Sequence, residues 1–280
     1  MATSSARRRS GRRKAATTLT EIPDHLLAEI LLRLPAAEDL ARASAACLTF
    51  RRLVVDTDGS FLRRFRRLHD PPLLAFFDRD GFHFHHALPP HPSAPAARAL
   101  ASAADFSFSF FPNHSDWAVQ DIRDGRVLLL HPGKQGLQRQ VSMELAVCDP
   151  LHRGYVLLPP VPDNLAASVA TAHKPWCEAF LVPLDQDPEA AFGVIWLLLS
   201  ATRVASFVYS STTGQWQTAA SKEWNDLFLE RCESATPPPI ERGFYQRHYA
   251  HGCFYWESTM MDEKEMLVLD TRRADGVLDF

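Results

Sequence analysis

Apolar residues recur at helical spacing through the first quarter of the chain. The first such stretch follows Ile22-Pro23 and stops at Pro35. Five of its apolar side chains recur at helical spacing: Leu26, Leu27, Ile30, Leu31 and Leu34. Because steps of three and four residues return to the same side of a helix, this stretch predicts an amphipathic helix of about three turns, with Pro23 suited to its first turn.

Three more helices are predicted before residue 70. They run from Glu38 to Cys47, from Phe50 to Val54 and from Ser60 to Leu68. Residues 19–69 are therefore expected to form a small all-α module. A module of this size buries only part of its apolar surface, so we expect a hydrophobic face to be left for a partner.

The pattern changes near residue 70, where short β-branched and aromatic runs separated by Pro, Gly and Asp replace the helical spacing. This change predicts a domain boundary. Residues 70–112 are expected to connect the two parts and to supply the first strands. One of these strands is predicted from the alternation of Phe106, Phe108 and Phe110, which gives a strand one buried face.

Two patterns recur between residues 113 and 280. A glycine opens a run of strand-forming residues at Gly125, Gly193 and Gly252. A strand then runs into a polar turn at Asp149, Ser210 and Asp270. The unit is about sixty residues long, and repeated antiparallel hairpins of this kind are typical of β-propeller blades; a β-sandwich with similar turns is the alternative.

Three such units are too few to close a ring of about four to eight blades. Residues 113–280 are therefore expected to be a partial, propeller-like region, either because the chain is truncated or because another surface covers an open edge. The expected fold class is α+β with several domains, in which an all-α module precedes an all-β domain of antiparallel sheets.

Charge separates the same two regions. Residues 1–70 contain 14 Lys and Arg against 8 Asp and Glu, whereas residues 71–280 contain 16 against 25. Residues 1–18 are basic and almost free of large apolar side chains, which predicts a disordered tail. Its basic clusters either form a nuclear import signal or have no such role. Nucleic acid is not an expected partner, because the tail lacks aromatic residues for base stacking. No apolar stretch reaches the eighteen residues of a membrane span.

Motifs for chemistry are absent from the sequence. The five cysteines form no CxxC pair, which argues against a disulfide framework or a metal knuckle. The histidine cluster His83, His85, His86 and His91 is expected to be a solvated loop rather than a metal site. No nucleophile elbow, phosphate loop or zinc-protease motif occurs, so we expect neither an enzyme nor a cofactor. Trp176, Trp196, Trp216, Trp224 and Trp256 are expected to pack between sheets, and the alternative is that an exposed one anchors a ligand at a propeller mouth.

Residues 19 to about 66 resemble an F-box. The resemblance rests on the Ile22-Pro23 opening, the helix closed by Leu34-Pro35, the Leu-Ala-Arg-Ala-Ser segment at residues 40–44 and the segment Cys47 to Leu53. Phe50 departs from the tryptophan usual in the family. The resemblance implies docking on a Skp-type adaptor, which links the F-box to cullin and RING subunits. The implied adaptor contacts, or their immediate support, are Ile22, Pro23, Leu26, Ile30, Leu34, Pro35, Leu40, Cys47 and Phe50.

Residues 71–280 look like the region that accompanies the F-box in many plant, especially grass, F-box proteins. The similar phrases are Gly-Arg-Val-Leu-Leu at residues 125–129 and Val-Cys-Asp-Pro-Leu at residues 147–151. The resemblance implies a non-catalytic, substrate-recognising subunit of a cullin-RING ubiquitin ligase in the nucleus or cytoplasm. Two alternatives remain: a truncated chain that competes for the adaptor without a substrate, and a propeller that binds a small ligand or glycan.

Overall fold

The computed structural model describes two compact units, Met1–Leu73 and Leu74–Phe280. The described residues are 22–55, 58–69, 72–78, 83–131, 144–162, 165, 176–182, 191–200, 202–228, 244–258 and 266–272. The basic tail predicted at residues 1–18 lies outside them. The described residues form a mixed α and β structure, with helices in the first unit and four antiparallel sheets in the second.

The first unit contains the predicted helices. They are α1 (Asp24–Leu31), α2 (Ala37–Ala46), α3 (Leu48–Val54) and α4 (Ser60–Leu68). Pro23 caps α1 from an extended conformation, and Glu38 and Asp39 lie in the first turn of α2, where the helix dipole favours carboxylates. The core between the helices consists of Leu31, Leu32, Leu40, Val54, Phe61 and Phe65.

The second unit begins with a small sheet and a helix. Strand β1 (Ala75–Phe77) pairs with β2 (Phe84–His86), and α5 (Ala94–Ala103) follows. The 3₁₀ helix His114–Asp116 comes before the larger sheets. The histidine cluster was predicted to lie in a loop, but the ladder between β1 and β2 places His85 and His86 in a strand, so that prediction was wrong for these two residues.

The strand predicted around Phe106, Phe108 and Phe110 is also absent, because these residues lie in consecutive turns. The carboxylate of Asp105 accepts hydrogen bonds from the hydroxyl groups of Ser107 and Ser109 and from the backbone N–H of Ser107. Phe108 has φ of 56°. Local side-chain hydrogen bonds thus replace the strand ladder that the alternation of phenylalanines predicted.

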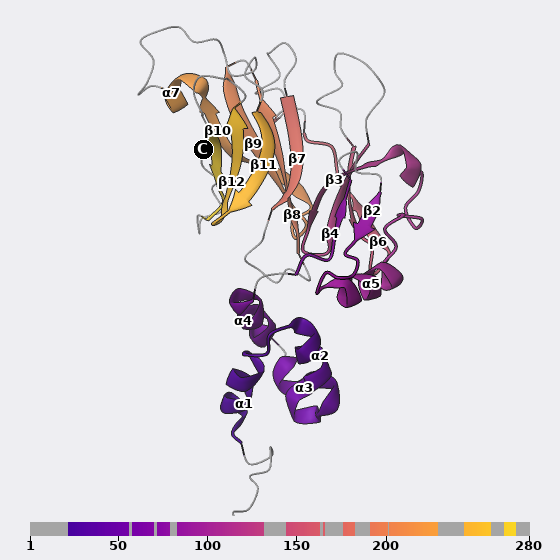
Figure 1. Ribbon diagram of the computed structural model, residues 1–280. Coiled ribbons are helices and arrows are strands. Elements are labelled where there is room, and N and C mark those ends of the chain that lie inside the picture. The colour runs from indigo at the N-terminus through magenta and orange to yellow at the C-terminus, as the bar shows by residue number, and fades with distance from the viewer. Residues whose placement is uncertain are drawn as a thin grey trace, which may run out of the picture. The chain divides into compact units, whose positions relative to one another are not determined.

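Three larger sheets follow in chain order, and each is an antiparallel meander (Figure 1). The first sheet contains β3 (Ala118–Arg123), β4 (Arg126–His131), β5 (Glu144–Asp149) and β6 (Gly154–Leu157). The second contains β7 (Trp176–Val182), β8 (Gly193–Leu199), β9 (Arg203–Ser210) and β10 (Gln215–Glu223), and α7 (Trp224–Phe228) follows it. The third contains β11 (Phe244–Ala250), β12 (Cys253–Ser258) and β13 (Met266–Asp270).

The second sheet is covered on both faces. Alternate residues of β8, such as Trp196, pack towards the first sheet in one core cluster, and the intervening residues, such as Leu197, pack towards the third sheet in another. Every residue of β8 is consequently buried. This arrangement explains why the sequence of β8 is a continuous apolar run, since a strand buried on both faces has no polar side.

The two sequence patterns occupy equivalent positions in these sheets. Gly125 and Gly252 are the second residues of two-residue turns, with φ of 77° and 76°, a conformation that favours glycine. Gly193 differs, because it is the first residue of β8 and follows a longer connection. At the ends of the third strands, the side chains of Asp149, Ser210 and Asp270 each accept a hydrogen bond from the N–H two residues ahead, at 3.0, 3.3 and 2.9 Å. The repeat predicted from the sequence is therefore confirmed as the second and third strands of each sheet.

Candidate functional site

Helix α1 has apolar side chains on two adjacent faces, and only one face is covered. Leu27 and Leu31 are each 3% exposed and pack inside the first unit. Leu26 and Ile30 are 48% and 53% exposed. Pro23 is also exposed and precedes Leu26 by three positions. Pro23, Leu26 and Ile30 therefore lie along one side of the helix. We call Pro23, Leu26 and Ile30 the α1 stripe.

The residues implied as adaptor contacts divide by burial. Pro23, Leu26, Ile30 and Pro35 are exposed, and Ile22, Leu34, Cys47 and Phe50 are half-buried. Leu40 is buried in the core of the first unit, and Leu34 and Phe50 pack against that core. These three therefore support the surface from inside rather than form its centre. Phe50, which replaces the usual tryptophan, still fills a core position.

Cys47 caps α3 beside an exposed apolar residue, Leu48. The backbone N–H groups of Phe50 and, to a smaller extent, Thr49 donate hydrogen bonds to the sulfur of Cys47 and hold the pKa of Cys47 below its ordinary value.

An ion pair of 2.7 Å between Arg64 of α4 and Glu29 of α1 connects α1 to the rest of the unit. Exposed pairs of this kind contribute little, about 0 to 1 kcal/mol, so the buried leucines hold α1 in place.

The second unit contains a largely buried ionic cluster at the first strands of the three sheets. Arg247 of β11 forms ion pairs with Asp121 of β3, at 2.9 Å, and with Glu178 of β7. The indole N–H of Trp256 donates to Glu178 at 2.8 Å, and the backbone N–H of Leu181 donates to Asp121 at 2.8 Å. One arginine thus links all three sheets.

Two irregularities in the strands place these charges. The pairing of β3 shifts between Val119 and Asp121, and the pairing of β11 shifts between Tyr245 and Arg247. A bulge of this kind re-aims the side chain that follows it. Burial raises the pKa of Glu178, and this effect outweighs the opposing attraction of Arg247. This cluster was not predicted from the sequence. Its sign in the sequence is that Asp121, Glu178 and Arg247 are charged residues within strand-like segments.

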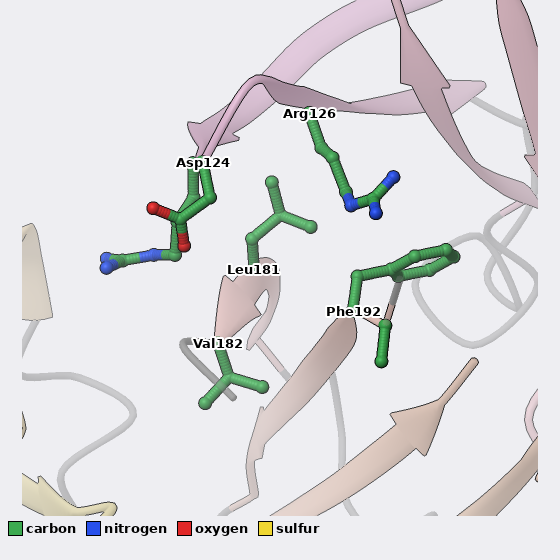
Figure 2. Close-up of a pocket in the computed structure, with 7 residues that line it drawn as sticks. Asp124, Arg126, Leu181, Val182 and Phe192 are labelled. Carbon is green, nitrogen blue, oxygen red and sulfur yellow. The ribbon is translucent and has the colours of Figure 1, made fainter. Parts of the chain in front are cut away.

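A small hollow lies between the turn that joins β3 to β4 and the adjoining ends of β7 and β8. It is lined by Arg123, Asp124, Arg126, Leu181, Val182, Ala191 and Phe192. Figure 2 shows Arg126 directed towards the ring of Phe192 and Asp124 on the other side of Leu181. The guanidinium carbon of Arg126 lies 5.2 Å from the centre of the Phe192 ring.

Arg123 reaches from the same turn to the third sheet. Its guanidinium carbon lies 4.4 Å from the ring centre of Tyr249 and 5.5 Å from that of Phe254. Its Nε is buried and has no hydrogen-bond acceptor among the described residues. Two arginines beside one two-residue turn therefore each stand over an aromatic ring of a different sheet.

The sequence also raised metal ligands, reactive cysteines and packed tryptophans as candidates. Within the described ranges, no three His, Cys, Asp or Glu side chains lie close enough together to hold a metal ion. Burial raises the pKa values of Cys148 and Cys177 to about 12. Trp196, Trp216, Trp224 and Trp256 are buried between or beside sheets, and Trp176 is half-buried against the core that contains Trp256, which confirms the predicted packing role. No helix among the described residues has the length and apolarity that a membrane span requires.

No protein-family model matches the chain, and no curated protein matches its sequence. The resemblance to an F-box remains a prediction from the sequence motifs.

Proposed function

We propose that the chain is a non-catalytic substrate-recognition subunit of a cullin-RING ubiquitin ligase. In this proposal the first unit is an F-box that binds a Skp-type adaptor through the α1 stripe. The observation that carries the proposal is the exposure of Leu26 and Ile30 on α1, at two of the positions that the F-box motif implies for adaptor contact.

The energetics of the α1 stripe favour a protein partner. Burying a large aliphatic side chain that was exposed contributes about 1.5 to 3 kcal/mol. Leu26 and Ile30 are half-exposed, and Pro23 and Pro35 flank them at the ends of the helix. A rigid apolar surface of this kind, held from inside by Leu27 and Leu31, would gain stability from docking without rearranging its own core.

The second unit supplies the substrate-binding part of the proposal. Its successive antiparallel meanders pack face to face, an arrangement that supports a partial, propeller-like domain. Such a subunit would act by holding a substrate near the transferring enzyme, which raises the effective concentration of the reacting groups without chemistry of its own.

Binding of the purified chain to a Skp-type adaptor tests this function. The wild type is compared in a pull-down with an Ile22→Ala/Pro23→Ala variant, and circular dichroism checks that both are folded. Leu68→Ala is the matched control, because Leu68 is an exposed apolar residue of α4 outside the α1 stripe. The proposal expects binding by the wild type and by Leu68→Ala, and loss of binding in the folded double variant. A folded wild type that does not bind the adaptor would overturn it.

A further inference from the structure

Strand β6 forms one edge of the first sheet, and exposed apolar side chains lie along it. The strand order of that sheet is β3, β4, β5 and β6, so β6 pairs with β5 alone among the described strands. Tyr155, Val156 and Leu157 are 41%, 43% and 58% exposed, and Leu151, in the turn before β6, is 48% exposed. An apolar strand at the edge of a sheet is a template for pairing with another chain.

The register of β6 fixes the direction of its backbone groups. The N–H of Leu158 donates to the carbonyl oxygen of Leu145 at 2.9 Å. Residues of an antiparallel strand alternate between those that exchange hydrogen bonds with the partner strand and those that do not. Val156 therefore directs its N–H and C=O groups to β5, and Tyr155 and Leu157 direct theirs away from it. Among the described residues, no backbone group bonds to these two residues from the open side.

Strand β10, at an edge of the second sheet, differs from β6 in two features that prevent pairing with another chain. Lys222 and Glu223 carry charges on β10, and its pairing with β9 shifts between Thr218 and Ala220. Charges and bulges of this kind protect an edge from a foreign strand. Strand β6 contains no charged residue, and its pairing with β5 runs without a shift in register. The sequence of β6 thus lacks the protection that β10 has.

Contacts inside the second unit hold β6 extended before a partner arrives. The ring of Tyr155 meets that of Phe111 edge-on, with 4.8 Å between their centres, and Phe111 is buried in a core cluster of the unit. In the ladder, Tyr155 lies opposite Cys148 and Val156 opposite Val147, and both of these β5 residues are buried. A strand that is already ordered loses little conformational entropy when a further strand pairs with it.

A second copy of the chain matches this edge. When two β6 strands run antiparallel about a two-fold axis at Val156, Tyr155 of each copy lies opposite Leu157 of the other. These are the residues whose backbone groups point away from β5, so each pair exchanges both of its hydrogen bonds. The side chains of each pair share one face of the extended sheet, and an aromatic residue opposite an aliphatic one is a favourable cross-strand pair.

The residues that flank β6 fit the same arrangement. Arg153 precedes the strand and lies opposite Pro159 of the second copy, so the two arginines stand at opposite ends of the paired strands. Pro159 and Pro160 have no N–H to donate, which ends the pairing after Leu158. We propose that β6 pairs with β6 of a second copy and makes the chain a symmetric dimer. The proposal goes beyond the proposed function and does not rest on it.

Sedimentation velocity of the full-length chain tests the pairing. We expect the wild type to change from monomer to dimer with a dissociation constant of about 1 to 100 µM, because two short strands bury less surface than a standard interface. Val156→Lys places like charges opposite each other at the axis and should raise this constant by about tenfold or more. Val55→Lys, at an exposed valine of the first unit, is the matched control and should dimerise like the wild type. A wild type that stays monomeric at about 200 µM, or a Val156→Lys variant that dimerises like the wild type, would overturn the proposal.

A disulfide tests the register in a chain that keeps an uncharged residue at the axis. Val156 faces Val156 of the second copy in a pair without hydrogen bonds, where the Cα atoms of antiparallel strands are about 4.5 Å apart. That separation suits a disulfide, so Val156→Cys should form a covalent dimer under mild oxidation, visible on a non-reducing gel. Val55→Cys is the matched control and should form much less. Equal covalent dimer from the two variants, or none from Val156→Cys, would overturn the pairing at β6.

Discussion

Helix α1 of the first unit and strand β8 of the second unit differ in how much of their apolar surface is exposed. In α1, Leu26 and Ile30 lie beside Leu27 and Leu31 in sequence, yet the first pair is about half exposed and the second pair is buried. In β8, all seven residues are buried, because sheets cover it on both faces. The α1 stripe of the first unit thus stays uncovered, whereas the second sheet of the second unit has other sheets packed on both of its faces.

Charged residues show the same contrast. Two ion pairs among the described residues of the first unit, Arg42 with Asp39 and Arg64 with Glu29, lie at the surface. In the second unit, Arg247 joins Asp121 and Glu178 in a largely buried cluster. Charge pairing thus accompanies the apolar contacts between the sheets of the second unit, whereas the described ion pairs of the first unit lie outside its core.

The largest expected effect comes from breaking that cluster. Arg247→Met leaves Asp121 and Glu178 buried without their cation, so we expect the free energy of unfolding to fall by about 3 to 5 kcal/mol. Arg272→Met is the matched control, because Arg272 pairs with Asp270 at the surface, where an ion pair contributes little to stability. Urea denaturation of the full chain measures both values. Equal small losses would show that the cluster does not hold the sheets together.

The pH dependence of Arg247→Met sharpens this prediction. Burial raises the pKa of Glu178 in the folded chain, so ionised Glu178 destabilises the fold as the pH rises through that pKa. Without Arg247 the pKa should rise further. We therefore expect the deficit of the variant to be largest at neutral pH and to shrink as the pH falls towards about 5. A deficit that is constant with pH would contradict this account.

Neighbouring leucines of α1 test the division of its two faces. Leu27→Ala removes a buried side chain and should destabilise the first unit by about 2 to 5 kcal/mol. Leu26→Ala removes an exposed side chain of the same size and should change stability by no more than about 0.5 kcal/mol. The helical circular dichroism signal during thermal unfolding measures both. Similar losses for the two variants would mean that the α1 stripe belongs to the core.

A smaller effect is expected at the turn between β9 and β10. Gly214 has φ of 68°, whereas Gly154 lacks a positive φ, and neither has an atom within 4 Å of an added Cβ. Gly214→Ala should therefore cost about 1 kcal/mol through backbone strain alone, and Gly154→Ala should cost less. Urea denaturation distinguishes them. Equal costs would show that turn conformation does not limit the stability of the second sheet.

The smallest expected effect is at Asp105. Hydrogen bonds from Ser107 and then Ser109 lower the pKa of Asp105, so its contribution to stability is present above about pH 4 and is lost as the pH falls through the lowered folded value. Asp105→Asn should remove about 0.5 kcal/mol or less at neutral pH, and the difference should shrink in acid. Asp116→Asn, at an exposed aspartate, is the control. A loss that grows in acid would contradict the assignment.

Local patterns in the sequence predicted the elements whose structure is decided locally. The spacing from Leu26 to Leu34 predicted α1, and the recurring glycines and polar turn residues predicted the second and third strands of the sheets. The strand predicted from the alternation of Phe106, Phe108 and Phe110 was wrong, because the carboxylate of Asp105 accepts hydrogen bonds from Ser107 and Ser109 and stabilises turns instead. Arg247 and Glu178 are 69 residues apart, so only the stacking of the sheets brings them together.

Only those parts of the candidate sites that belong to contiguous motifs were predictable from the sequence. Leu26 and Ile30 belong to a contiguous motif, and their position on α1 follows from helical spacing. Whether each is buried depends on how the four helices pack, so Leu40 was included among possible contacts although it lies in the core. Arg123 and Tyr249 meet only through the packing of separate sheets, so no local pattern pointed to this contact.

The dissociation constant for a Skp-type adaptor tests the central claim most directly. Titration compares the wild type with a Leu26→Ala/Ile30→Ala variant and with Leu68→Ala. We predict that the double variant keeps its helical fold and loses about a hundredfold or more in affinity, because two apolar side chains leave the interface. Leu68→Ala should bind like the wild type. Unchanged affinity in the folded double variant would show that the α1 stripe is not the adaptor-binding surface.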